Sequence, residues 1–395
     1  MKILIGADTF APDVNGSATF TRALAAGLAG RGHDVHLMVP GYPGHVGTFT
    51  EEHAGHNVTV HRQYSWRWYP HPWLRFMLPW RAKPNAEKIT RAIKPDAIHF
   101  QSHIVVGRGL VTAAVKHDIE LVGTNHTMPE NMMQHVQILP RFMLGWLARI
   151  QWGSAKHWFE QADSITAPTR NAADFFEKNT GLSGVHAVSC GIDSHLYTAD
   201  FTPRTKNVIV FLGRLDEEKH IHELLEAAAR LDPALDVEVR IVGMGEALRP
   251  LQARARELGI TDRVHFTGKV SYEQLRAELT RATVFGMPSR AELQSIATME
   301  ALASGLPVVA ANAMALPHLV HPDVNGYLFE PGNIDQFAEY LTKVLTMPQD
   351  ELDHLKRGSL RTVEAHDIQR TLDIFEALYR GESVVDVDTE AAPEK

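Results

Sequence analysis

Several features that would define a protein class are scarce or absent in this chain of 395 residues. Cys190 is its one cysteine, which excludes an intramolecular disulfide and a four-cysteine zinc site and favours a reducing compartment. The formal net charge of −8 lacks the basic excess of a dedicated nucleic-acid-binding protein. No apolar run approaches the roughly 20 residues that span a bilayer, and Met1–Ala7 does not resemble a secretory signal. The sequence therefore predicts a cytoplasmic protein that binds no nucleic acid.

The length of the chain and its alternating patterns predict two α/β domains of Rossmann-like, doubly wound type. Short β-branched runs alternate with helical patterns from the strand Lys2–Ala7 onward, which is typical of parallel sheets built from βαβ units. The pattern begins again at Asn207–Gly213. We expect a first domain over 1–190, a linker over 191–206, a second domain over 207–364, a helix over 365–380 packing back on the first domain, and a disordered tail over 381–395. Ligands are expected at the carboxyl ends of the strands, in a cleft between the domains.

The most informative pattern is a pair of glutamates in the stretch Pro288–Pro307. Glu292 and Glu300 are separated by seven residues, and a helix is expected from Leu293 to Ser304. The first turn of a helix offers unpaired backbone N–H groups that favour a diphosphate, here those of Leu293, Gln294, Ser295 and Ile296. Glu292 is then expected to reach a group attached to the phosphate, and Glu300 a diol such as a ribose. The alternative is a surface helix with two solvated glutamates.

A second pattern is Gly213–Lys219, which directly follows the first strand of the second domain. Arg214 and Lys219 would lie at the carboxyl end of that strand, where an Arg fork and a Lys charge can hold a diphosphate without a metal. They would also stabilise charge as the nucleotide leaves. The alternative is a solvated basic pair beside the three acidic residues of the same loop.

Two loops of the first domain carry weaker signals. The loop Asp8–Gly16 ends in Asn15-Gly16, and its glycine permits a close backbone approach just before a helix. His126 ends a predicted strand, where it can hydrogen-bond a sugar hydroxyl. In the second domain, Gly243-Met244-Gly245 lacks the third glycine of a dinucleotide fingerprint, which argues against a nicotinamide or flavin enzyme.

The order of these motifs along the chain, each after a predicted strand, resembles that of glycosyltransferase family 4. Members of this family are retaining enzymes of the GT-B fold. The resemblance extends over nearly the whole chain, to Leu316–Asn333. It implies catalytic roles for His126, Arg214, Lys219 and Glu292. It implies a donor site formed by Gly16, Gly213, Arg214, Lys219, Val270, Glu292, Leu293, Gln294, Ser295, Ile296 and Glu300. The family often reads Glu-x-Phe-Gly where this chain has Glu292-Leu293-Gln294-Ser295, which we interpret as a difference of subtype.

The mechanism implied by the resemblance transfers a hexose with retention and uses no cofactor or metal, the nucleotide sugar being a co-substrate. The leaving diphosphate oxygen would help to deprotonate the acceptor hydroxyl on the same face of the sugar. The donor base stays open between UDP and GDP. No acidic residue stands at Ser271 or Tyr272 to pair with guanine, which favours UDP slightly.

The stretch His61–Lys83 suggests the acceptor. It interleaves aromatic and basic side chains, a combination that suits a lipid headgroup layer. The candidates for acceptor or membrane contact are Trp66, Arg67, Trp68, Trp73 and Arg75. The alternative is a partly buried loop that packs on its own domain. A second aromatic stripe, Met132–Trp158, is expected to form core.

The resemblance also points to diacylglycerol glycosyltransferases and phosphatidylinositol mannosyltransferase relatives, and so to a membrane glycolipid or its precursor on the cytosolic leaflet. Such an enzyme would be peripheral on the membrane. The oligomeric state stays open. Three alternatives remain: a soluble acceptor such as a polyol or polysaccharide, a sugar-nucleotide epimerase, and a non-catalytic protein that binds nucleotide sugars.

Overall fold

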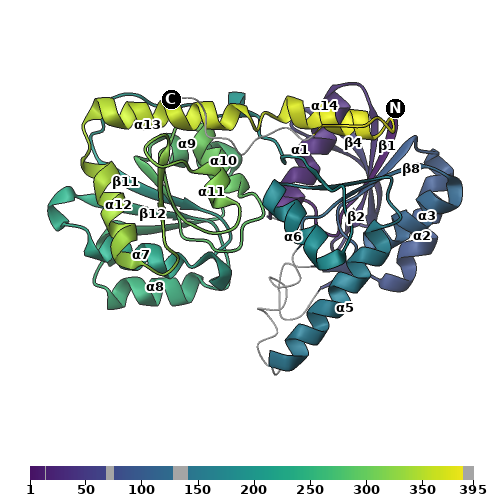
Figure 1. The fold of residues 1–395 in the computed structure, drawn as a ribbon, viewed down its shortest axis with the longest axis horizontal. Helices are drawn as coiled ribbons and strands as arrows, with labels where there is room; N and C mark the ends of the chain where they lie inside the picture. Colours follow the sequence, from purple (N-terminus) through teal and green to yellow (C-terminus); the bar gives the residue numbers. More distant parts are fainter. Residues whose placement is uncertain (14, 68–74, 128–140, 386–395) are drawn as a thin grey trace. The chain divides into compact units, whose positions relative to one another are not determined.

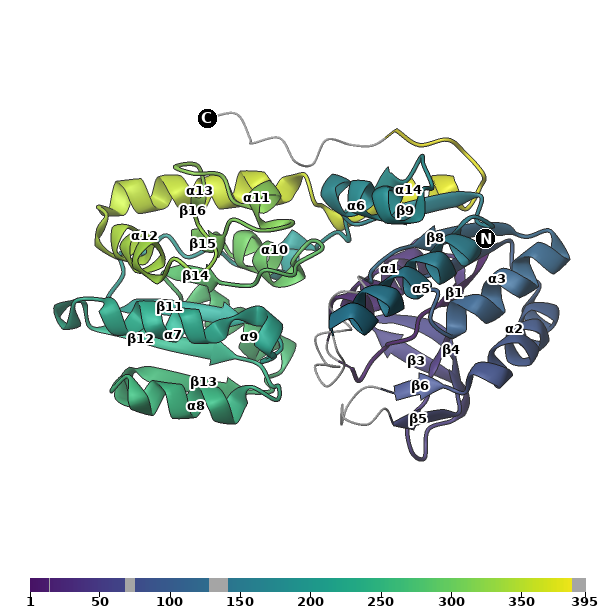
Figure 2. The same ribbon diagram turned by 60° about the horizontal axis from the view of Figure 1, so that its bottom comes forward.

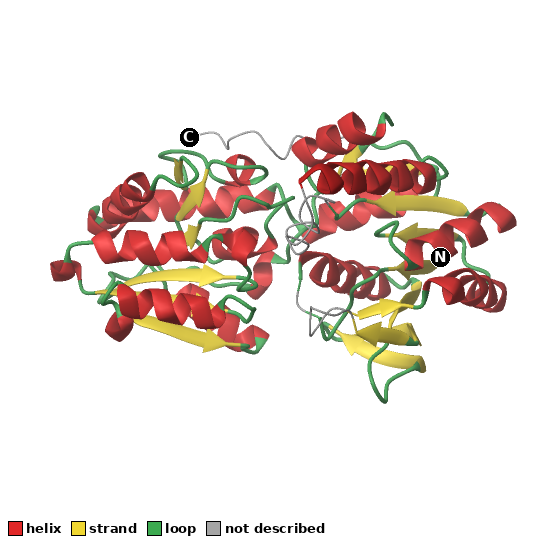
Figure 3. Ribbon diagram, turned by 90° about the horizontal axis from the view of Figure 1, so that it is seen from below, coloured by secondary structure: helices red, strands yellow, loops and turns green. Residues whose placement is uncertain are grey.

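A computed structural model describes residues 1–13, 15–67, 75–127 and 141–385. It divides into two compact units, Met1–Gly191 with Ile368–Val387, and Ile192–Asp367. The strands of each unit lie between helices, as Figure 3 shows in yellow and red. Two α/β units are therefore present, as the alternating sequence pattern predicts.

The first unit contains an eight-stranded sheet with the order β10-β9-β8-β7-β1-β2-β4-β3. All neighbours pair in parallel except β3, which is antiparallel to β4. A separate hairpin joins β5 and β6. The strands are β1 Lys2–Gly6, β2 Asp34–Pro40, β3 Gly47–His53, β4 His56–Gln63, β5 Ser65–Arg67, β6 Arg75–Met77, β7 Ala97–Phe100, β8 Glu120–Thr124, β9 Ser164–Ala167 and β10 His186–Ala187.

The helices of the first unit include one that belongs to the C-terminal part of the sequence. They are α1 Gly16–Gly30, α2 Pro79–Ile93, α3 Val106–His117, α5 Arg141–Phe159, α6 Arg170–Thr180 and α14 Ile368–Leu378. The segment predicted as a returning helix over 365–380 thus contains α14, which lies beside α1 (Figure 1). Arg31 at the end of α1 pairs with Asp373 at 2.6 Å, and the buried Tyr379 contacts His99 at 2.8 Å. No helix among the described residues is both long enough and apolar enough to cross a membrane.

The second unit contains a six-stranded, fully parallel sheet with the order β13-β12-β11-β14-β15-β16, visible as a stack in Figure 2. Its strands are β11 Asn207–Leu212, β12 Val237–Val242, β13 Val264–Gly268, β14 Val284–Met287, β15 Val308–Ala311 and β16 Gly326–Phe329. Its helices are α7 Ile221–Arg230, α8 Leu248–Glu257, α9 Tyr272–Thr280, α10 Ile296–Ala303, α11 Leu316–Leu319, α12 Ile334–Thr346 and α13 Gln349–Glu364. Strands buried on both faces read as continuous apolar runs, as in Asn207–Leu212.

The boundary between the units differs from the prediction. The segment 191–206, predicted as a linker, lies almost entirely within the second unit, which begins at Ile192. The N–H of Ile192 donates to the carbonyl of His366 at 2.8 Å, and Arg204 donates to the carbonyl of Val344 at 3.1 Å. These contacts attach 191–206 to the second unit. The Asp, Ser, Thr and Pro residues of this segment had suggested a linker. The part of the predicted tail beyond residue 385 lies outside the described residues.

Candidate active site

The predicted donor residues of the second unit lie in loops at one edge of its sheet. Because all six strands are parallel, the loops that follow β11, β12, β13 and β14 leave the same carboxyl edge. Gly213–Lys219 follows β11, Val270 follows β13, and Glu292 follows β14. The topology therefore gathers these residues on one edge from three loops.

The loop after β12 holds the backbone around Arg214. The N–H of Leu215 donates to the carbonyl of Met244 at 2.9 Å, and the N–H of Ala247 donates to the carbonyl of Leu215 at 2.8 Å. A Cβ atom on Gly245 would lie 2.1 Å from the Leu215 oxygen, so only glycine permits this approach. Gly243-Met244-Gly245, a poor dinucleotide fingerprint, thus frames the predicted phosphate loop. The sequence feature that could have indicated this backbone contact is the pair of glycines, Gly243 and Gly245, directly after β12.

Arg214 is oriented by two buried carboxylates. Its Nη1 contacts Asp216, and its Nη2 donates to Glu218 at 2.8 Å. The side chains of these acids are 4% and 6% exposed, whereas that of Arg214 is 32% exposed. The acidic residues of this loop are therefore not a solvated face. They fix the guanidinium fork while leaving part of it open to a ligand.

Lys219 and Glu292 are 73 residues apart in sequence and form an ion pair of 2.6 Å. Burial by itself would raise the pKa of the Glu292 carboxyl. The charge and hydrogen bond of Lys219, with smaller contributions from Ser289 and Arg214, lower this pKa below its ordinary value. Glu292 is thus an anion at neutral pH. Two residues predicted separately as catalytic are in direct contact.

The helix that contains Glu300 begins later than predicted. We expected it from Leu293, but α10 begins at Ile296, because Ser295 has a left-handed backbone with φ 70° that interrupts the helical path. Leu293 and Gln294 therefore precede the helix, and Gln294 is buried. Within the described chain, no acceptor is bonded to the N–H groups of Ser295, Ile296 and Ala297. The free donors of this terminus therefore begin at Ser295, two residues after the predicted first donor Leu293, and include the predicted Ser295 and Ile296.

Glu300 is buried in the second turn of α10 and accepts a hydrogen bond from the Tyr197 hydroxyl at 2.9 Å. Burial, together with the Glu300 charge, raises the pKa of Tyr197. Tyr197 lies in the segment predicted as linker, and no sequence pattern marked it. Near the same edge, the side chain of Ser271 caps α9 and is not free for a nucleotide base, while Val270 beside it is half-buried.

His126 and Gly16 belong to the first unit. His126 follows β8, and its ring lies 4.8 Å from that of Phe20 on α1. Its Nε2 is shielded from solvent and has no partner in the described part of the chain, and burial lowers its pKa to about 4. The imidazole is therefore neutral at pH 7. Gly16 is the first residue of α1, whose N-cap Asn15 accepts the N–H of Ala18 at 2.9 Å.

The first unit contains a buried carboxylate that sequence reasoning left without a role. Asp8 accepts the N–H of Val106 at 3.0 Å at the beginning of α3 and contacts the Ser102 hydroxyl. Burial raises the pKa of Asp8, while these hydrogen bonds act in the opposite direction. The sequence feature that could have indicated a role for Asp8 is its position directly after β1, at the carboxyl edge of the sheet.

The predicted acceptor residues are only partly described. Trp66 is 62% exposed on β5, and Arg67 beside it is exposed. Arg75 donates to the Ser65 hydroxyl at 2.8 Å and to the Ser65 carbonyl at 2.9 Å, so this guanidinium holds the hairpin together. Trp68 and Trp73 lie outside the described residues.

Exposed aromatic surface also occurs where core was expected. On α5, Trp146 and Ile150 are 60% and 46% exposed, so the prediction that the stripe Met132–Trp158 forms core is wrong for these two residues. Trp152 on the same helix is buried. The helical spacing agrees with the prediction, but among the described residues Trp146 and Ile150 are not covered by a neighbouring element.

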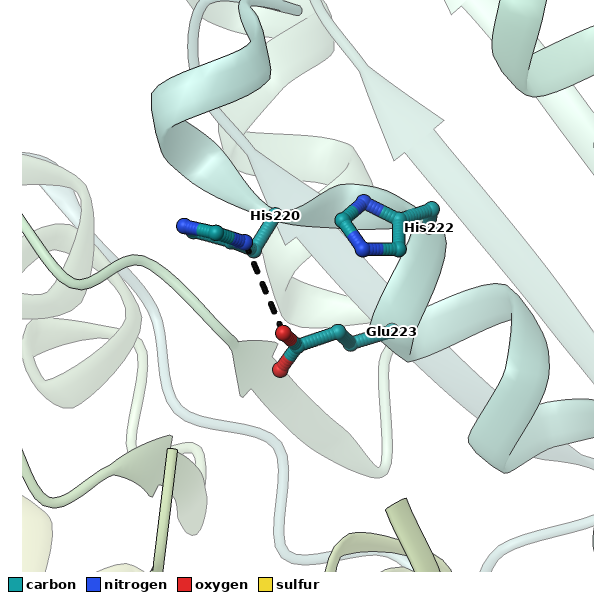
Figure 4. Close-up of side chains that lie close together, drawn as sticks. All are labelled: His220, His222 and Glu223. Carbon is teal, nitrogen blue, oxygen red and sulfur yellow. Dashed lines mark ion pairs between the residues drawn. The ribbon is translucent and has the colours of Figure 1, made fainter. Parts of the chain in front are cut away.

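The described residues include one group with the donor types of a metal site, formed by His220, His222 and Glu223 (Figure 4). Nδ1 of His220 lies 3.5 Å from Glu223, which also pairs with Arg290. Burial, with the charge of Arg290, lowers the pKa of His220 to about 4. The guanidinium at the same carboxylate opposes a second positive charge there.

Two family models match the chain in succession. The glycosyltransferase family 4 model matches residues 14–196, and the model of glycosyl transferases group 1 matches residues 199–359. The sucrose-phosphate synthase of Thermosynechococcus elongatus superposes with a TM-score of 0.81 at 19% identity, over 96% of this chain and 98% of that one. This likeness establishes the GT-B fold.

Curated relatives support the same assignment. A GDP-mannose-dependent alpha-mannosyltransferase of Mycolicibacterium smegmatis is 28% identical over 88% of both chains. An alpha-monoglucosyldiacylglycerol synthase of Streptococcus pneumoniae is 23% identical over 95% of this chain and 85% of its own. An MMP alpha-(1->4)-mannosyltransferase of Mycolicibacterium hassiacum is 34% identical, but the match spans only about half of each protein, 49% and 48%. The family and fold predicted from the sequence are confirmed: the chain belongs to glycosyltransferase family 4 and is a glycosyltransferase of the GT-B fold.

Proposed function

We propose that this protein transfers a hexose, with retention of configuration, from a nucleotide diphosphate sugar to a hydroxyl group of a membrane lipid. The observation that carries the proposal is the cluster of Arg214, Lys219 and Glu292 at the carboxyl edge of the second unit's sheet. A guanidinium fork and an ammonium group suit a diphosphate. An ionised carboxylate beside them suits the hydroxyls of the attached sugar.

Each group then has one function in the transfer. Arg214, held by Asp216 and Glu218, is fixed before the ligand arrives, and a preorganised charge stabilises the departing diphosphate most effectively. The unpaired N–H groups at the beginning of α10 add donors of the same kind. A departing phosphate oxygen takes the proton of the acceptor hydroxyl on the same face of the sugar, and no metal is required. His126, neutral at pH 7, is available as a hydrogen-bond partner for the sugar.

The identity of the donor nucleotide is supported by the relatives more than by the residues of this chain. Relatives that match most of the chain include GDP-mannose-dependent enzymes, which makes GDP-mannose the first donor to test. The lack of an acidic residue at Ser271 or Tyr272 favours UDP instead. Thermal shift with GDP and UDP decides between them, because a ligand at a hundred times its dissociation constant stabilises the native state by about 2.7 kcal/mol.

The lipid acceptor is supported by exposed aromatic side chains with basic neighbours. Trp66 and Trp80 are 62% and 70% exposed, and Arg67, Arg81 and Lys83 near them in sequence are exposed as well. Rings of this kind sit at the headgroup boundary while cations attract anionic lipids. A relative of similar length synthesises a glucosyldiacylglycerol. A peripheral position on the cytosolic leaflet follows from this proposal.

Replacement of Arg214 by alanine tests the proposed site. We expect turnover to fall about 100-fold or more, since losing one stabilising donor of this kind costs roughly 3–4 kcal/mol. Arg230→Ala is the matched control, because Arg230 is an exposed arginine of the same unit paired with Asp335. Labelled GDP-mannose and UDP-glucose are offered with liposomes that contain diacylglycerol or phosphatidylinositol. Normal transfer by Arg214→Ala would refute its role in diphosphate binding.

A further inference from the structure

A pocket of about 380 Å³ lies in the second unit, at the opposite edge of the sheet from the donor residues. Its lining comes from the segment before β11, the residues just before β14, and α13. Lys206 and Thr283 each immediately precede a strand, which places the pocket at the amino ends of β11 and β14. Arg214 follows the other end of β11, and a strand of that length extends about 20 Å. The pocket is therefore separate from the proposed donor site.

The lining of this pocket has an excess of positive charge. Four basic residues line it, Arg204, Lys206, Arg281 and Lys356, against the single acidic residue Asp200. The Asp200 carboxylate already accepts the N–H of Thr202 at 2.8 Å. The pocket is large enough for a small organic ligand.

Two of these cations are bonded to main-chain carbonyls and to no acid. Arg204 donates to Val344 at 3.1 Å and to Met347 at 2.5 Å, and Lys356 donates to the Asp200 carbonyl. Neither forms an ion pair with a carboxylate of the described residues, although Lys356 is only 7% exposed. Burial lowers the pKa of both groups. Lys356 is buried and Arg204 is half-buried. The charges of Asp353 and Asp200 act on Lys356, but neither acid is within ion-pair distance of it. Because buried cations are normally paired with an anion, these two cations facing a pocket indicate a place for an anionic ligand.

The other two cations are only partly neutralised. Lys206 lies 2.8 Å from Glu238, and Arg281 lies 3.8 Å from the same carboxylate, which also accepts from Arg240 at 2.6 Å. Glu278 also pairs with Arg240 at 2.6 Å and lies 4.0 Å from Arg281, so two carboxylates serve three basic side chains. Both Lys206 and Arg281 remain about half exposed and can turn toward a ligand in the pocket.

We propose that this pocket binds a small anion bearing a phosphate group, either inorganic phosphate or a sugar phosphate. The half-buried Arg204 and the buried Lys356 would hold it from the inner side, and Lys206 and Arg281 would close on it from the solvent side. The hydroxyls of Thr202 and Thr280 in the lining suit the ring of a sugar. A bound phosphate would connect the segment before β11 to α13 and so stabilise the second unit.

The test measures phosphate binding by isothermal titration on the full chain, at constant ionic strength maintained with chloride. We expect inorganic phosphate to bind the unaltered protein and Arg281→Gln or Lys356→Met to weaken binding at least tenfold, as loss of a charge-assisted bond predicts. Arg281→Gln alters an exposed side chain, so it keeps the test valid if the buried Lys356→Met variant does not fold. Glucose 6-phosphate in a parallel titration distinguishes the sources: tighter binding than inorganic phosphate identifies a sugar phosphate, and equal binding identifies the free ion.

Two controls separate this pocket from the donor site. Arg214→Ala should leave phosphate affinity unchanged, and Arg230→Gln should do the same as an exposed cation elsewhere in the unit. The proposal is wrong if phosphate does not bind, if Arg281→Gln leaves the affinity unaltered, or if Arg214→Ala abolishes the signal. It does not depend on the proposed transferase function, which is measured by hexose transfer.

Discussion

Removal of the Lys219 charge should destabilise the second unit by an amount that depends on Glu292. The two side chains are each 13% exposed and 2.6 Å apart. Lys219→Met keeps the length of the side chain but leaves a carboxylate buried without its cation, and such a change costs about 3–5 kcal/mol in a fully buried pair. Because water still reaches this pair in part, we expect about 2–3 kcal/mol. Glu292→Gln in the same background should recover most of that loss, giving a coupling of about 1–2 kcal/mol.

The pH dependence of this loss has a defined sign. The pKa of Glu292 in the folded protein is lowered, so its contribution to stability is present above its unfolded value of 4.5 and is lost as pH falls through the folded value. In Lys219→Met, burial is the largest influence on the Glu292 carboxyl, and it raises the pKa of that carboxyl. The deficit of Lys219→Met should therefore shrink as pH falls toward about 4–5, because the stranded carboxyl becomes protonated.

The distribution of tryptophan makes this measurement selective. All seven tryptophans precede residue 192, so fluorescence reports unfolding of the first unit. Circular dichroism during urea unfolding follows the loss of helix in both units. Hydrogen exchange of peptides from 192–367 then reports unfolding of the second unit alone. Only the second unit should respond to Lys219→Met. If the effects of the two single variants simply add, within about 0.5 kcal/mol, the ion pair contributes nothing and the reasoning fails.

Two further predictions concern the metal and the membrane. EDTA should leave hexose transfer within about twofold of the untreated rate, because cationic side chains and helix N–H groups hold the diphosphate; strict dependence on added Mg²⁺ or Mn²⁺ would contradict this account. Replacement of Trp66 and Trp80 by serine should weaken sedimentation with anionic liposomes while leaving thermal stabilisation by donor nucleotide unchanged. Val115→Ser, which alters another exposed apolar residue of the first unit, is the control, and unchanged liposome binding by the tryptophan variant would exclude this surface.

The sequence predicted the sheets and the loops that follow their strands because both depend on local patterns. Continuous β-branched runs such as Asn207–Leu212 identify buried parallel strands, and parallel strands place their following loops at one edge. Arg214 and Glu292 could therefore be assigned to one edge of one sheet without coordinates. The contact between Lys219 and Glu292 depends on the side-chain conformations of two loops, and no local pattern encodes it.

The failures have physical causes that can be named. The start of α10 was predicted too early because Ser295 gives no sequence signal for its left-handed backbone, which glycine or asparagine would have marked. Tyr197 was missed because its role comes from a single hydrogen bond to Glu300 across 103 residues. No role was predicted for the acidic residues beside Arg214, because charged runs are usually solvated, whereas here Asp216 and Glu218 are buried against the guanidinium.

The charges around the proposed diphosphate site have a consequence for catalysis. Arg214 and Lys219 face three carboxylates, those of Asp216, Glu218 and Glu292, so this cluster has no excess positive charge before a donor binds. An arriving diphosphate must share Lys219 with Glu292, which weakens nucleotide binding in the ground state. When the sugar develops positive charge, Glu292 gains an interaction that Lys219 alone cannot supply, and binding energy is then expressed in the transition state. Glu292→Gln should therefore bind GDP or UDP several-fold more tightly in calorimetry while transferring hexose at least tenfold more slowly. Weaker nucleotide binding by this variant would show that Glu292 does not compete for Lys219.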